Sequence, residues 1–112
     1  RRQMRVVFTG SRREHEMAQD IINRMRYREK ALDIAGKTSL SQLAAVLQRC
    51  QLVLCPDSGT MHIARAVGTP LVGLFLAENP AEWGYNESGF TSVKGRNITV
   101  EQVLKKILEH KI

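Results

Sequence analysis

A run of small polar residues after the third apolar stretch of the chain has the composition of an anion-binding turn. The segment Asp57-Ser58-Gly59-Thr60-Met61-His62 directly follows Leu52-Val53-Leu54-Cys55. Gly59 lets the backbone approach a ligand closely, because it carries no side chain. If a helix begins here, the amides of residues 58–61 point outward at the positive end of its dipole. Such a helix start suits a phosphate or a diphosphate.

His62 falls in the first turn of that helix, where its imidazole can donate a hydrogen bond to the same anion. A purely structural interpretation stays open beside this one. Asp57 and Ser58 also fit as an N-cap pair that holds the helix start, and His62 fits as a partly buried histidine with a protein partner. The position of the segment between an apolar strand and a helix is what gives it functional meaning.

The sequence has no metal-binding pattern. Cys50 and Cys55 have four residues between them and no second pair of ligands nearby, which makes a poor zinc site. No Asp-x-Asp pair is present to chelate a cation bound to a diphosphate. Cys55 ends an apolar run, where a free thiol behaves as a small hydrophobic side chain. We therefore expect reduced cysteines, no metal and no cofactor.

The chain has 112 residues and a formal net charge of +6. That length fits one domain with a modest core. A positive net charge of this size suits an anionic partner, such as nucleic acid, an anionic membrane surface or a phosphorylated ligand. A nucleic-acid partner is disfavoured, because only two aromatic residues, Phe8 and Tyr27, lie among the N-terminal cations and no helix-turn-helix, finger or aromatic sheet signature appears. These cations are Arg1, Arg2, Arg5, Arg12, Arg13, Arg24, Arg26, Arg28 and Lys30. No apolar run approaches the ~20 residues that span a bilayer.

The first half of the chain alternates between strand and helix patterns. Val6 to Thr9 is a short β-branched run stopped by a Gly-Ser pair, which predicts a strand buried on both faces. Apolar residues recur at helical spacing from Glu14 to Arg28. Ala31 to Ile34 predicts a second strand. Ser39 to Gln42 has the capping-box spacing that opens a short helix.

The second half continues the alternation. It contains strand patterns at 52–55, 71–75 and 90–93, a helix pattern from Thr60 to Ala66, and a capping box at Thr99 to Gln102. The helix opened by this capping box is predicted to turn Val103, Leu104, Ile107 and Leu108 inward. Strands interleaved with helices, without hairpin signals, predict an α/β, doubly wound fold with a mostly parallel sheet and helices on both faces.

The quoted motifs carry a family resemblance. The run from Asp57 to Ala66, followed by Gly68 to Phe75, resembles the nucleotide-binding segment of family-nine glycosyltransferases, the lipopolysaccharide heptosyltransferases of GT-B fold. Other stretches resemble that family in the same order, so the resemblance covers nearly the whole chain. They are Val6–Gly10 with Glu14 and Glu16, Ala35–Leu40, Asn79-Pro80 with Trp83-Gly84, and Ile98–Val103.

The resemblance implies a single nucleotide-sugar-binding domain over residues 1–112, the Rossmann-like C-terminal half of a GT-B enzyme. It implies transfer of heptose from ADP-heptose to a lipopolysaccharide core acceptor, a glycolipid, at the cytoplasmic face of the inner membrane. The donor diphosphate would be held by Ser58, Gly59, Thr60, Met61 and His62, with Asp57 shaping the turn or meeting the donor sugar. Gly36, Lys37 and Thr38 would lie by the nucleoside, and Asn79 would face the interdomain cleft. Lys37 fits equally well as a solvated loop lysine, and Trp83 better as a packing residue.

The chain also departs from the family pattern in two ways. The N-terminal acceptor domain with its general base is missing, so we expect no catalytic residue here beyond His62 as a stabiliser of the leaving group. A central strand before Val6 is also missing, so exposed strand edges and self-association are expected. Two alternatives remain open: a non-catalytic nucleotide- or phosphate-binding module, and another nucleotide-sugar enzyme of GT-B type.

Overall fold

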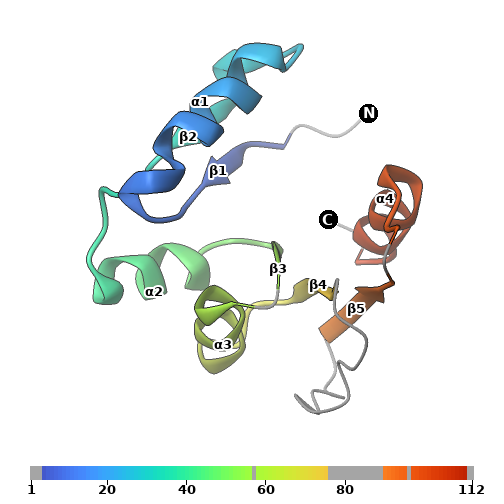
Figure 1. Ribbon diagram of the computed structural model, residues 1–112. Coiled ribbons are helices and arrows are strands. Elements are labelled where there is room, and N and C mark those ends of the chain that lie inside the picture. Colours follow the sequence, from blue (N-terminus) through green and yellow to red (C-terminus); the bar gives the residue numbers. More distant parts are fainter. Residues whose placement is uncertain (1–3, 57, 76–89, 96, 111–112) are drawn as a thin grey trace. The chain divides into compact units, whose positions relative to one another are not determined.

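The computed structural model describes residues 4–56, 58–75, 90–95 and 97–110. Contacts divide the chain into two compact units, Arg1–Leu43 and Ala44–Ile112. Each unit is built around its own parallel sheet (Figure 1). The helix α2 (Leu40–Gln48) runs across the boundary between the two units.

The first unit is a β-α-β arrangement. Its elements are β1 (Val6–Phe8), a 3-10 turn η1 (Arg12–Glu14), α1 (His15–Arg24), a second 3-10 turn η2 (Arg28–Lys30) and β2 (Ala31–Asp33). The strands β1 and β2 pair in parallel, with Val6 opposite Ala31 and Phe8 opposite Asp33. The helix α1 packs against β2. This arrangement brings the carboxyl ends of both strands to one edge of the sheet.

The helix α1 is shorter than the sequence pattern predicts. It ends at Arg24, and Met25 is extended, with φ −75° and ψ 145°. The prediction of a helix to Arg28 is therefore wrong at its end. A longer helix would place the cations Arg24 and Arg28 one turn apart, and like charges at that spacing disfavour a helix.

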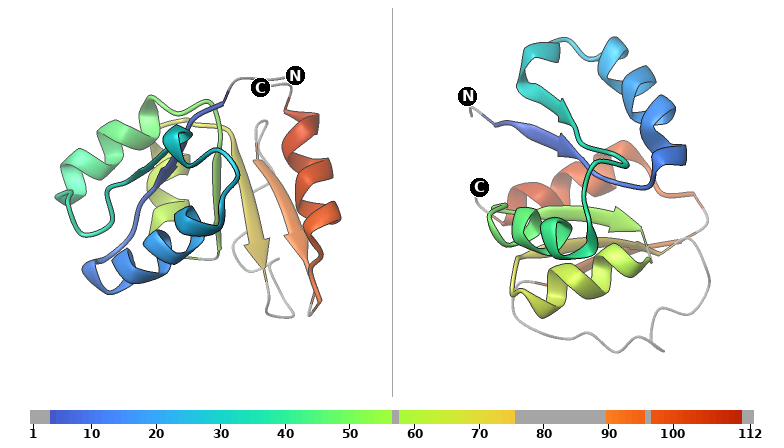
Figure 2. Two further views of the ribbon diagram at one scale, coloured as in Figure 1. Left: turned by 90° about the horizontal axis from the view of Figure 1, so that it is seen from above. Right: turned by 90° about the vertical axis from the view of Figure 1, so that its left-hand side faces the viewer.

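The second unit contains a three-stranded parallel sheet in the order β3-β4-β5. Its elements are β3 (Val53–Pro56), α3 (Gly59–Ala66), β4 (Leu71–Phe75), β5 (Phe90–Lys94) and α4 (Val100–Glu109). Val53 lies opposite Leu71 in the first pair of strands, and Leu71 lies opposite Phe90 in the second. The helices α3 and α4 lie on opposite faces of this sheet (Figure 2). The core of the unit includes Val53, Cys55, Met61, Ala64, Leu71, Val72, Phe75 and Val93.

Two contacts hold the ends of the helices in this unit. The hydroxyl of the buried Thr69 donates a hydrogen bond of 2.7 Å to the carbonyl of Leu47, near the end of α2. The capping box predicted at Thr99 is present, because the Gln102 amide donates to Thr99 Oγ1 and the Thr99 amide donates to Gln102 Oε1. Cys50 and Cys55 are both free thiols, as expected, and burial raises the pKa of Cys50.

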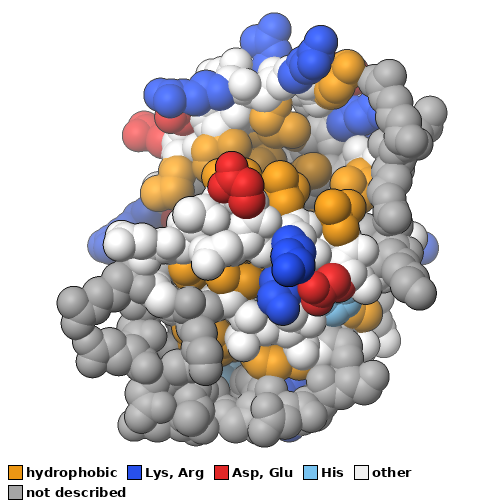
Figure 3. Space-filling view, turned by 90° about the vertical axis from the view of Figure 1, so that its right-hand side faces the viewer, with side chains coloured by type: hydrophobic (Ala, Val, Ile, Leu, Met, Phe, Trp, Pro, Cys, Tyr) orange, Lys and Arg blue, Asp and Glu red, His pale blue; other side chains and the backbone are white. Residues whose placement is uncertain are grey.

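Several predictions of burial are wrong. Val6 and Val7 are 41% and 36% exposed, because β1 belongs to a two-stranded sheet on which α1 covers one face. Leu54 on β3 is also exposed. Hydrophobic side chains therefore reach the surface of the described residues (Figure 3).

The terminal helix differs from its prediction in the same way. Leu104 and Leu108 on α4 are 50% and 55% exposed, whereas Val103 and Ile107 are half-buried. Successive side chains on a helix point about 100° apart around its axis. Leu104 and Leu108 therefore point about 100° away from Val103 and Ile107, respectively, off the face that packs on β5.

The fold class is confirmed as α/β with parallel strands and helices on both faces of the larger sheet. Among the described strands, β1 and β2 share no ladder with β3, β4 and β5. The single domain over residues 1–112 stays a prediction.

Candidate functional site

The turn between β3 and α3 lies at the carboxyl end of a parallel strand, where open α/β sheets bind ligands. β3 ends at Pro56, and α3 begins at Gly59. Ser58 is the N-cap residue, with an extended backbone at φ −158° and ψ 175°, and its side chain makes no capping hydrogen bond. Asp57 lies outside the described residues. The start of α3 is thus not capped by the Ser58 hydroxyl.

The backbone amides of this turn fall into two groups. The Met61 amide donates to the Ser58 carbonyl at 3.1 Å. In the part of the chain that the structure describes, the amides of Gly59 and Thr60 donate to no acceptor. A Cβ built on Gly59 would have no atom of another part of the chain within 4 Å, so a side chain at this position has room. Within the described residues, the turn therefore supplies two unpaired donors.

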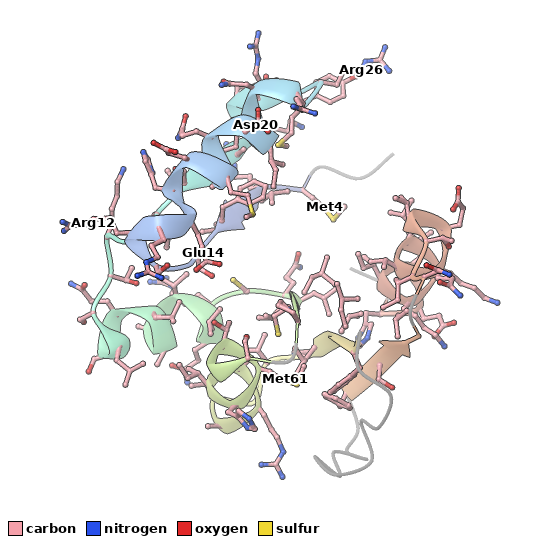
Figure 4. All side chains as sticks on the ribbon, in the orientation of Figure 1. Met4, Arg12, Glu14, Asp20, Arg26 and Met61 are labelled. Carbon is pink, nitrogen blue, oxygen red and sulfur yellow. The ribbon has the colours of Figure 1, made fainter. Side chains whose placement is uncertain are left out.

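Met61 has a packing role in addition to its place in the turn. Its side chain is fully buried and extends from α3 toward β4 (Figure 4). A Cβ on Gly73 would lie 2.7 Å from Met61 Cε, so the two residues are in close contact. Met61 thereby fixes the first turn of α3 against the central strand of the sheet. His62 follows it in the same turn and is half-buried.

The second predicted segment, Gly36 to Ser39, lies at the carboxyl end of β2. Gly36 has a positive φ of 75°. Its amide donates to the Gly10 carbonyl at 2.8 Å, and a Cβ here would lie 2.8 Å from Arg12 Cα. Glycine is therefore required, because both the backbone angle and the close approach exclude a side chain. Lys37 is exposed and Thr38 is half-buried.

Ser39 ends this loop and caps α2. Its amide donates to Gln42 Oε1 at 2.8 Å, and the Gln42 amide donates to Ser39 Oγ at 3.1 Å. The capping box predicted from the sequence is thus present. Figure 4 shows Arg12 and Glu14 in the segment after β1, which the Gly36 contact joins to this loop.

A cluster around Asp33, the last residue of β2, was not predicted from the sequence. The Asp33 carboxylate is buried and accepts hydrogen bonds from Gln19 Nε2 and the Ala35 amide, each at 2.9 Å. His15 Nδ1 lies 2.7 Å from Asp33 Oδ2, the same oxygen that accepts from Gln19. The hydrogen bond from Gln19, then that from Ala35, holds the pKa of Asp33 below its usual range, with further help from the charges of His15 and Lys37.

A signal for this cluster exists in the sequence. His15 and Gln19 have the i, i+4 spacing that places two side chains on one face of a helix. Asp33 is a charged residue at the end of an otherwise apolar strand, just before the Ala-Gly turn.

The predicted site residues lie in both compact units. Ser58 to His62 belong to the second unit, and Gly36 to Thr38 belong to the first. Asn79 and Trp83 lie outside the described residues. No group of three or more potential metal ligands occurs among the residues that the structure describes. Across the same residues, no helix has the length and apolar character needed to cross a membrane.

Comparisons with known proteins identify related sequences and similar folds. The sequence model of glycosyltransferase family 9 (heptosyltransferase) matches residues 1–110. The lipopolysaccharide core heptosyltransferase OpsX of Haemophilus influenzae is 43% identical over 77 residues, which are 67% of this chain and 22% of that protein. Lipopolysaccharide heptosyltransferase 2 of Escherichia coli is 34% identical over 77 residues, with the same coverage. The chain thus spans about a fifth of the length of these relatives.

Two solved structures are similar in fold. The ADP-heptose lipopolysaccharide heptosyltransferase II of E. coli matches with a TM-score of 0.85 at 24% identity, over 95% of this chain and 36% of that one. A glycosyl transferase of family 9 from Veillonella parvula matches with a TM-score of 0.74 at 29% identity, over 91% of this chain and 30% of that one.

Proposed function

Because the chain belongs to glycosyltransferase family 9, we propose that it is the donor-binding half of an enzyme that transfers heptose from ADP-heptose to a lipopolysaccharide core acceptor. Relatives named as lipopolysaccharide heptosyltransferases support this substrate class. The similar structure of the E. coli ADP-heptose lipopolysaccharide heptosyltransferase II supports the fold that would bind the donor.

The start of α3 is the observation that carries the proposal. The amides of Gly59 and Thr60 have no acceptor within the described residues, and the Ser58 hydroxyl leaves the helix start uncapped. An anion at this position would accept from both amides and meet the positive end of the helix dipole. The open space in front of Gly59 allows a diphosphate to approach the backbone.

The proposed chemistry is stabilisation of the leaving group. Transfer of the sugar leaves negative charge on the nucleoside diphosphate, and preorganised donors lower the free energy of that charged state. The amides of Gly59 and Thr60, with the imidazole of His62, are the proposed donors, and no metal ion is required. The group that deprotonates the acceptor hydroxyl would lie in the acceptor-binding part of the whole enzyme, at the cytoplasmic face of the inner membrane.

The nucleoside is proposed to lie by the loop after β2. Gly36 presents its backbone without a side chain, Lys37 is exposed, and Thr38 follows half-buried. Lys37 would meet the ribose or a phosphate. Asn79 is proposed to face the cleft between the donor-binding and acceptor-binding halves.

Calorimetric titration of ADP and UDP into the purified protein tests the proposal. The His62→Ala variant is expected to bind ADP about tenfold more weakly, which corresponds to roughly 1.4 kcal/mol for one charge-assisted hydrogen bond. The matched control is His110→Ala, which removes a half-buried histidine at the end of α4, whose Nε2 lies 3.0 Å from Thr91 Oγ1. The control should bind ADP as the wild type does.

Circular dichroism of each sample establishes that it is folded. Selective binding of ADP over UDP, weakened by His62→Ala alone, supports the proposed donor site. A folded protein that binds neither nucleotide contradicts it. Binding that His62→Ala and His110→Ala weaken equally would contradict the role of His62.

A further inference from the structure

The buried carboxylate of Asp33 is fully engaged by donors from its own unit. Oδ1 accepts from the Ala35 amide, and Oδ2 accepts from Gln19 Nε2 and lies 2.7 Å from His15 Nδ1. The Asp33 side chain is 4% exposed, whereas that of His15 is 43% exposed. The Asp33 carboxylate is thus held in place and contacts Nδ1 of the partly exposed His15 ring.

This contact determines which nitrogen of the neutral His15 ring carries the proton. A carboxylate can only accept, so Nδ1 must carry the proton that lies between His15 and Asp33. In the neutral ring, Nε2 is then an acceptor with a free lone pair. His15 makes no other contact that the structure describes, so its Nε2 has no partner within those residues.

The cluster lies at the ligand-binding end of the first sheet. Asp33 is the last residue of β2, and the Ala35 amide that it accepts from directly precedes Gly36. The Gly36 backbone in turn contacts the segment after β1 that leads into His15. Lys37 is close enough for its charge to act on Asp33. His15 and the proposed nucleoside loop therefore belong to one connected group.

We propose that His15 is a further ligand-contacting residue, whose Nε2 accepts a hydrogen bond from the nucleoside of the donor, either from a ribose hydroxyl or from a base amine. The inference rests on the proposed function and names a second contact of the same site. Asp33 and Gln19 are positioning residues: Asp33 fixes the tautomer and the ring plane, and Gln19 fixes Asp33. An oriented acceptor favours a hydroxyl or amine over a phosphate oxygen, which is itself only an acceptor.

Two substitutions of His15 separate ligand contact from packing. His15→Asn places an amide nitrogen near the position of Nδ1, so it keeps a donor for Asp33 and removes Nε2. His15→Gln reaches as far as Nε2 and gives up the short contact with Asp33. Both variants are titrated with ADP and with inorganic pyrophosphate, which has no nucleoside. Thermal unfolding of each variant is measured in parallel.

The expected result is that His15→Asn binds ADP about tenfold more weakly, binds pyrophosphate as the wild type does, and keeps the wild-type unfolding temperature. 2′-Deoxy-ADP, 3′-deoxy-ADP and inosine diphosphate, which lack the 2′-hydroxyl, the 3′-hydroxyl and the base amine, then identify the partner group. With the probe that lacks this group, His15→Asn and the wild type should bind equally well. Unchanged ADP affinity in His15→Asn, while His62→Ala still weakens both ADP and pyrophosphate, would overturn the inference and leave the proposed function intact. Failure of both ligands to bind a folded wild-type protein would overturn both.

Discussion

Met61 and Gly73 are in such close contact that a Cβ added at position 73 would force the end of the Met61 side chain to move. A Cβ on Gly73 would lie 2.7 Å from Met61 Cε and 3.2 Å from Phe75 Cε2. Gly73 is in the middle of β4, and Met61 is in the first turn of α3. The missing side chain on the strand therefore allows the helix start, with its unpaired amides, to pack directly on the sheet.

Gly73→Ala is expected to destabilise the protein by about 1–3 kcal/mol, the usual cost of overpacking a core. The Met61 side chain, whose end would have to move, is fully buried. Denaturant unfolding measures the change. The double variant Gly73→Ala with Met61→Ala should lose less stability than the sum of the two single variants. Strict additivity would contradict the proposed clash.

Gly59→Ala is expected to leave stability unchanged and to weaken binding of ADP. A Cβ at Gly59 meets no atom within 4 Å, so the folded protein accommodates it. In the proposed complex that space belongs to the diphosphate. Calorimetry measures the ADP affinity, and thermal unfolding of the same sample measures the stability. If Gly59→Ala binds ADP as tightly as the wild type does, the diphosphate binds elsewhere.

Asp33 should make stability depend on pH in the acid range. Its folded-state pKa lies below the ordinary value of 3.8, so its contribution is complete above that value and is lost as the pH falls through the folded-state pKa. The difference in unfolding free energy between wild type and Asp33→Asn should therefore shrink between pH 5 and pH 2, values chosen to bracket this range. Asp20→Asn is the control, because Asp20 is exposed beside Arg24. A difference that stays constant with pH would contradict the assignment.

ADP affinity should be unchanged by a chelator. The proposed site neutralises the diphosphate with backbone amides and an imidazole, not with a divalent cation. Titrations with EDTA and with added Mg²⁺ check this, and an affinity that collapses in EDTA would show that a metal ion takes part.

Self-association is expected through a strand edge. Among the described strands, β1 pairs with β2 alone, and Val6 on it is 41% exposed. An open, apolar edge is a template for pairing with another chain, and a lysine on it disfavours that pairing. Sedimentation should show association that rises with concentration and that Val6→Lys lowers, while Leu104→Lys on α4 does not. A monomer at every concentration would exclude this pairing.

Much of the fold could be predicted from local patterns. The strand at 71–75 and the capping boxes at Ser39 and Thr99 are found where the sequence predicts them. These features depend on a few neighbouring residues, so a sequence pattern is sufficient to locate them.

Features that depend on distant neighbours could not be predicted in this way. The exposure of Val6 and Leu104 depends on what covers each element, which periodicity alone does not specify. At the candidate site, the strand-turn-helix context of Ser58 to His62 could be predicted, and its use by a ligand stays a prediction. The cluster of His15 and Asp33 was missed because its two residues are 18 positions apart and meet only where α1 packs on β2.

The strand order has a consequence for amide hydrogen exchange. Of the strands that the structure describes, β4 alone has a neighbour on each side. Its amides should exchange most slowly, because they open only when the whole sheet of the second unit unfolds. β1 and β2 have one partner each and should exchange through smaller local openings. Since Met61 packs on β4 at Gly73, the start of α3 is anchored to the most protected strand, and the turn should keep its shape while the first sheet frays and re-forms.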